Sequence, residues 1–187
     1  MNGLLTLSAI IDRLLGFVAR IAAWAGFLLA CLIVYDVITR YFGVPKPFGL
    51  NSTKIQEFEY WLHTFLFSLL IGYAYTRQAH VRIDLIRDGL PIKAKYVLEI
   101  LGCLLLLIPF TMMAIYYSFN YVQASYGEGE VSKSVIGLSH IWILKAALPV
   151  LFILLLLAGI SQLIKSIAGL RGYLPVEKIA ETLGGDH

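Results

Sequence analysis

Few side chains in this sequence have types and spacings that could support chemistry. Asp36 and Arg40 are one helical turn apart, in the order that favours an ion pair at positions i and i+4. His63 and His140 could ligate a haem if they faced each other in a membrane bundle, although a lone histidine near a membrane border is more often an ordinary polar residue. The sequence has no zinc motif, phosphate loop or nucleophile elbow. These residues therefore predict ion pairing in a scaffold, with no catalytic role.

Composition indicates that the elements carrying these residues lie in a membrane. The chain has 187 residues, of which 59% are hydrophobic and 14% are charged. Ordinary soluble domains carry about a quarter charged residues. The two cysteines, Cys31 and Cys103, lie in apolar runs and form no redox or metal motif. The net charge of +3 comes from residues at the ends of apolar segments, so we interpret it as topology information and not as a nucleic-acid footprint.

Apolar runs bounded by polar residues predict an all-α integral membrane protein with one domain. The predicted transmembrane helices cover residues 17–41, 55–75, 96–122 and 141–164. An amphipathic helix over about residues 2–15 is expected to lie in the membrane interface before the chain turns inward. A short amphipathic helix is expected after Pro175 in the tail, residues 165–187. Pro109, in the middle of the third span, predicts a kink.

Basic residues indicate which side of the membrane each loop occupies. The connector over residues 76–95 is strongly basic, as cytoplasmic loops are. With both termini and this connector inside, and the loop over residues 123–139 outside, ten Lys or Arg residues lie inside and five outside. The inner ones are Arg13, Arg20, Arg77, Arg82, Arg87, Lys93, Lys95, Lys165, Arg171 and Lys178, and the outer ones are Arg40, Lys46, Lys54, Lys133 and Lys145. Both termini are therefore expected in the cytoplasm.

The middle of each predicted span is made of Leu, Ile, Val, Phe and Ala, and the ionisable residues lie near the borders. A secondary transporter usually builds its substrate site at mid-membrane from broken helices in two repeated halves. Pro109 and Pro149 do not occupy corresponding places in two halves. We therefore expect a scaffold that packs against another protein.

Several short motifs follow one another along the chain in a particular order and spacing. They are Asp36-Val-Ile-Thr-Arg40-Tyr41; Glu57-Phe-Glu59 followed by Trp61; Gly72-Tyr-Ala-Tyr-Thr-Arg77-Gln-Ala-His80-Val-Arg-Ile-Asp84-Leu closed by Leu90-Pro91; and Gly129-Glu130-Val-Ser132 followed by Trp142, Lys145 and Pro149. Together they resemble the small membrane subunit of tripartite ATP-independent periplasmic (TRAP) transporters, the DctQ-like family. The chain departs from the family pattern where acids that are commonly adjacent stand as Glu-Phe-Glu, and where the segment before Trp142 lacks a proline often found there.

The resemblance implies a heterocomplex in the inner membrane of a bacterium. A large membrane subunit, the M subunit, would carry the substrate and sodium sites, and a periplasmic binding protein would deliver an organic acid. This chain would need no cofactor of its own and would brace the large subunit among the membrane lipids. Two other interpretations stay open: a haem- or quinone-linked anchor subunit of a redox complex, and a stand-alone protein of four spans.

None of the candidate residues is expected to be catalytic or to bind a metal. We predict a polar cluster of Asp36, Arg40 and Glu57 at the outer ends of the first two spans, and a cytoplasmic corner in which His80 links Arg77 to Asp84. A solvated basic loop that only sets topology is the alternative for that corner. Tyr41 and Glu59 complete the predicted structural polar residues. Possible contacts with partner proteins are Trp61, Glu130, Ser132, Trp142 and Lys145, with loop residues 127–134 near the binding protein.

Overall fold

Long runs of Leu, Ile, Val, Ala and Phe fold into long helices in the computed structural model of this chain. The structure describes residues 2–46, 49–79, 89–134 and 136–184, and these residues contain no β-strand. The helices are α1 (Asn2–Tyr41), α2 (Ser52–Thr76), α4 (Ile92–Leu101), the π-helix η1 (Gly102–Leu107), α5 (Ile108–Gly127), α6 (Ile141–Lys145), α7 (Ala147–Leu170) and α8 (Glu177–Leu183). The all-helical class predicted from the sequence is therefore confirmed for this part of the chain.

Three helical segments are long and apolar enough to cross a membrane, and they cover Gly3–Tyr41, Ile92–Gly127 and Ile141–Leu170. Helix α2 has 25 residues, which correspond to about 38 Å at 1.5 Å per residue. Its length is sufficient for a bilayer, but Glu57, Glu59 and His63 lower its apolar character, and it is not among those three. The described residues thus contain three strongly apolar spans, with α2 as a more polar helix of similar length.

The N-terminal segment differs from the sequence prediction. A separate interfacial helix was expected over about residues 2–15, followed by a turn into the membrane, but α1 runs without a break from Asn2 to Tyr41. Residues 2–41 contain no proline, and the apolar face of the first part of α1 packs against α7. The buried side chains of this contact are Ile11, Leu15, Leu154 and Ala158. Packing on α7 therefore keeps the beginning of α1 in line with the rest of the helix.

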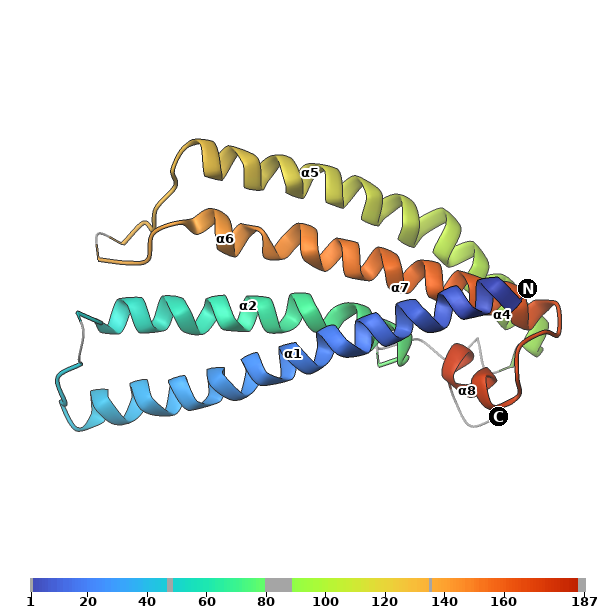
Figure 1. The fold of residues 1–187 in the computed structure, drawn as a ribbon, viewed down its shortest axis with the longest axis horizontal. Coiled ribbons are helices and arrows are strands. Elements are labelled where there is room, and N and C mark those ends of the chain that lie inside the picture. Colours follow the sequence, from blue (N-terminus) through green and yellow to red (C-terminus); the bar gives the residue numbers. More distant parts are fainter. Residues whose placement is uncertain (1, 47–48, 80–88, 135, 185–187) are drawn as a thin grey trace.

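Helix α7 is the central element of the bundle. It contacts α1, α2, α4 and α5, and α1 also packs along α2. Figure 1 shows α5, α7, α2 and α1 side by side. In the same view the loop between α1 and α2 and the loop between α5 and α6 lie at one end, and both chain termini lie at the other. We call these the loop end and the terminal end.

Proline residues explain the two irregular places in the long helices. The π-helix η1 ends two residues before Pro109, which cannot donate a backbone hydrogen bond and whose ring would crowd the carbonyl group of Leu105 in a regular α-helix. The predicted fourth span is divided at Ala146 into α6 and α7, and the backbone nitrogen of Pro149 cannot bond to the carbonyl group of Lys145. Both irregularities follow from a missing N–H group.

Gly72 allows close contact between α2 and its neighbours, and this contact gives a test of the packing. A Cβ atom at Gly72 would lie 2.7 Å from the carbonyl oxygen of Leu154 and 2.9 Å from the side chain of Leu15. We expect Gly72→Ala to destabilise the bundle by about 1–3 kcal/mol, the usual cost of overpacking, even though alanine favours helix. The measurement is the thermal unfolding midpoint of the purified chain in mild detergent.

Gly159→Ala is the matched control for this experiment. A Cβ atom at Gly159 would meet only the side chain of Leu107, at 2.7 Å, and the end of a leucine side chain can rotate away. We therefore expect a smaller change in the midpoint. Equal midpoints for the two variants would show that Gly72 does not limit how closely α2 approaches α7.

Candidate functional site

Polar side chains gather at the two ends of the bundle. At the loop end, the buried carboxylate of Asp36 accepts hydrogen bonds from both Arg40 and Lys46. Lys46 also donates to the hydroxyl group of Ser52, at 3.0 Å, and only 9% of its side chain is exposed. Asp36 therefore ties the end of α1 to the loop that follows and to the first residue of α2.

Glu57 does not join this cluster. Residues on an α-helix rotate by about 100° each, so Glu57 and Glu59 point to different sides of α2. Glu59 lines a pocket of about 520 Å³ together with Asp36, Arg40 and Tyr41. Glu59 thus lies where the sequence analysis placed Glu57. Tyr41 is largely exposed and packs edge-on against the neighbouring ring of Phe42.

Glu57 instead holds the loop between α5 and α6. Its buried carboxylate accepts hydrogen bonds from the hydroxyl group of Ser132 and from the backbone N–H of Leu138. The amide of Asn51, at the start of α2, donates to the carbonyl of Ile136 in the same loop, at 3.1 Å. These bonds join the beginning of α2 to a loop about 80 residues later.

Glu130 and Lys145 form a second anchor for this loop. The carboxylate of Glu130 accepts hydrogen bonds from Lys145 and from the hydroxyl of Ser125, the latter at 2.6 Å. The ammonium group of Lys145 lies 3.9 Å from the centre of the Tyr121 ring, a cation–π distance. Lys145 holds the pKa of the Glu130 carboxyl below its ordinary value, with a further contribution from Ser125.

The aromatic residues proposed as partner contacts are packed within the chain. Trp142 packs edge-on against Tyr126, with ring centres 5.4 Å apart. Trp61 is buried, and its indole nitrogen has no hydrogen-bond partner among the described residues. A buried indole N–H usually finds an acceptor, so Trp61 lacks a bond that such a group ordinarily makes.

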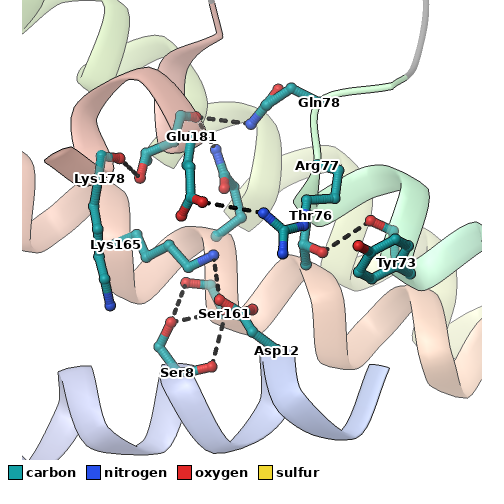
Figure 2. A network of polar contacts seen from close by, with 12 residues as sticks. Ser8, Asp12, Tyr73, Thr76, Arg77, Gln78, Ser161, Lys165, Lys178 and Glu181 are labelled. Atoms are coloured by element: carbon teal, nitrogen blue, oxygen red, sulfur yellow. Dashed lines mark hydrogen bonds and ion pairs between the residues drawn. The ribbon is translucent and has the colours of Figure 1, made fainter. Parts of the chain in front are cut away.

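At the terminal end, Arg77 connects α2 to the C-terminal helix. Its guanidinium group donates to the carboxylate of Glu181 at 3.0 Å and lies 5.3 Å from the centre of the Tyr73 ring (Figure 2). The sequence predicts contacts of Arg77 with His80 and Asp84, and both of these residues lie outside the described part of the chain. The partner found for Arg77, Glu181, was not foreseen.

A buried polar seam joins α1 to α7 at the same end. The hydroxyl groups of Ser8 and Ser161 are 2.8 Å apart, and Ser161 donates to Asp12 at 2.6 Å. The ammonium group of Lys165 lies 2.7 Å from the other carboxylate oxygen of Asp12 (Figure 2). This seam is not among the contacts predicted from the sequence, although each helix carries its two polar residues four positions apart, on one face.

Helix α8 is fastened to the bundle by the same region. The side-chain amides of Gln78 and Gln162 both donate to the carbonyl oxygen of Thr182, at 2.7 and 2.6 Å. Leu183 is fully buried in a hydrophobic cluster with Tyr96 of α4 and Ala168 of α7. The short tail helix therefore closes the terminal end of the bundle.

The remaining candidates from the sequence lie apart from these clusters. His63 packs its ring against Phe67 on its own helix, and His140 bonds to the neighbouring hydroxyl of Ser139. In the described ranges no group of three or more His, Cys, Asp or Glu side chains is placed to hold a metal ion. The interactions of the polar clusters join helices and loops to one another.

Apolar helices long enough to cross a bilayer, joined by polar contacts at their ends, define an all-helical membrane protein. The particular family follows from comparison with known families. The family described as "Tripartite ATP-independent periplasmic transporters, DctQ component" matches residues 29–169, about three quarters of the chain. The protein therefore belongs to this family of transporter components, which is not a family of enzymes. No curated protein and no solved structure matches the chain.

The shared carboxylate of Asp36 gives a prediction about stability at the loop end. Asp36→Asn leaves Lys46 without its ion-pair partner in a mostly buried position, so we expect a loss of about 3 kcal/mol. Arg40→Gln should lower the free energy of unfolding by about 1 kcal/mol or less. The reason is that 49% of the Arg40 side chain is exposed and that Asp36 keeps its ion pair with Lys46. Thermal unfolding in detergent measures both changes. If the two variants were equally stable, Asp36 would not be the centre of this cluster.

The lowered pKa of Glu130 gives a prediction about pH. A carboxyl whose pKa is lowered by folding stabilises the protein fully above its ordinary pKa, and the stabilisation is lost as the pH falls through the lowered value. We expect the difference in unfolding midpoint between the wild type and Glu130→Gln to be constant down to about pH 5 and to shrink in stronger acid. Glu128→Gln, at an exposed position of the same loop, is the control. A difference that grew on acidification would contradict the ion pair.

Proposed function

We propose that this chain is the small accessory subunit of a TRAP transporter and braces a large membrane subunit in the bacterial inner membrane. The proposal rests on one observation: most residues in the apolar helices are not buried by other parts of the chain. In their most apolar stretches, 17% of the residues are buried in Gly3–Tyr41, 11% in Ile92–Gly127 and 28% in Ile141–Leu170. So much apolar surface requires lipid or another membrane protein as its surroundings.

The proposal includes four membrane spans with both termini in the cytoplasm. The position of α2 beside α1 and α7 supports α2 as a span, because Glu57 is then buried and Glu59 is partly covered by other parts of the chain. Glu57 bonds to the loop between α5 and α6, and Glu59 lies beside the Asp36 cluster. An acidic residue costs less near a membrane border when it has such partners. The distribution of basic residues supports the orientation.

The same arrangement favours a bracing role over a transport pathway in this chain alone. The described polar clusters lie at the loop end and the terminal end, while the helical stretches between the two ends consist mostly of apolar residues. A route for an organic acid and a coupling ion needs polar ligands at mid-membrane. In the proposed complex, the large subunit provides the substrate and sodium sites, and a periplasmic binding protein delivers the organic acid.

The loop end is the proposed docking side for the binding protein. The loop between α5 and α6 is held by Glu57 and Lys145, so its surface is a defined shape. Glu128 is an exposed charged residue of this loop. The apolar side chain of Val131 is also exposed in the same loop. A fixed, partly charged surface facing the periplasm suits transient contact with a soluble partner.

The test of this function is uptake in cells that hold the matching large subunit and binding protein. We expect deletion of this chain to abolish uptake of the transported organic acid, and expression of the chain from a plasmid to restore it. The large subunit should also co-purify with the tagged chain in mild detergent. Full uptake without this chain would contradict an accessory role that transport depends on.

A further inference from the structure

The terminal end contains a small polar cavity that the bracing role does not use. Its volume is about 200 Å³, and it lies between the beginning of α1, the end of α2, the end of α7 and α8. The lining residues with charged side chains are Asp12, Arg77, Lys165, Lys178 and Glu181, and the others are Ala9, Tyr73 and Thr76. Figure 2 shows the side chains of Lys165, Arg77 and Glu181 pointing toward one another from three different helical segments.

The cavity has one more positive than negative side chain. Lys165 is paired with Asp12 at 2.7 Å, and Arg77 is paired with Glu181 at 3.0 Å. Lys178 is exposed, and its ammonium group has no ion-pair partner within the described ranges. An ammonium group carries three donors and a guanidinium group five, so the three basic residues keep donors beyond their two ion pairs. The lining therefore offers an excess of donors and positive charge to an anion.

The surroundings of the cavity favour a ligand that has an apolar part. On α1, next to the cavity-lining Ala9, the side chains of Ile10 and Leu14 are about half exposed. In the proposed orientation the cavity lies on the cytoplasmic side of the membrane, in the region of the lipid headgroups, and these exposed apolar side chains are beside it. A phospholipid could place its phosphate in the cavity and its chains along α1.

We propose that this cavity binds a phosphate group, and that a phospholipid headgroup is its source. Basic groups recognise phosphate through charge-assisted hydrogen bonds, and Arg77 and Lys165 can supply them from the end of α2 and from α7, while the exposed Lys178 of α8 adds positive charge to the lining. Binding would link α2, α7 and α8 through one ligand. The inference rests on the membrane orientation proposed above, but it does not depend on the large transporter subunit.

The experiment measures lipid binding to the purified full-length chain without its partner proteins. Delipidated protein in detergent is titrated with phosphatidylglycerol, and bound lipid is counted by native mass spectrometry. We expect Lys178→Gln to weaken binding about five-fold, the usual effect of one basic residue at an anionic membrane surface. Lys178→Arg should bind like the wild type. Lys93→Gln, which removes the same charge from an exposed position outside the cavity, should also bind like the wild type.

A second variant tests the cavity without changing any charge. Ala9→Leu places a larger side chain at an exposed lining position, so it should weaken binding while leaving the unfolding midpoint unchanged. Unchanged binding in both Lys178→Gln and Ala9→Leu would overturn the proposal. Inorganic phosphate is added as a competitor: failure to displace the lipid supports the headgroup, and displacement at similar concentrations would overturn the lipid as the source. Because uptake is not measured, failure here would leave the bracing function standing.

Discussion

The cost of placing an unpaired charge among lipid chains organises this structure. A charged side chain at the centre of a membrane helix costs about 3 kcal/mol on insertion scales, and the cost falls near the borders and when the charge is paired. The chain keeps its charged clusters at the two ends of the bundle and pairs them there. Asp36 is held by Arg40 and Lys46 at the loop end, and Asp12 is held by Lys165 at the terminal end.

These end contacts also fasten together elements that are distant in the chain. The loop between α5 and α6 is bonded to Glu57 on α2, and α8 is bonded to the end of α2 through Arg77 and Gln78. Between the ends, the helices meet through apolar and small residues around α7, such as Gly72 against Leu154. A bundle fastened at both ends, with apolar outer faces, is suited to hold a larger membrane protein in place.

Sequence reasoning succeeded where the determining information is local. Apolar runs located the long helices, and the spacing of Asp36 and Arg40 fitted an ion pair within one helical turn. It failed where partners are distant in the chain: Ser132 lies 75 residues from Glu57, and Glu181 lies 104 residues from Arg77. The break expected after residue 15 also depended on distant information, because α7 supplies the surface that keeps α1 continuous. The order of the family motifs was informative because it combines many local features.

The most direct test of the account is solute flux through this chain alone. The purified chain is reconstituted in liposomes with an imposed sodium gradient, with and without the large subunit, and uptake of the organic acid is measured in the presence of the binding protein. We expect uptake only when the large subunit is present, because the described helices are mostly apolar between their ends and provide few ligands for a polar solute. Saturable, selective uptake by liposomes that contain only this chain would contradict it.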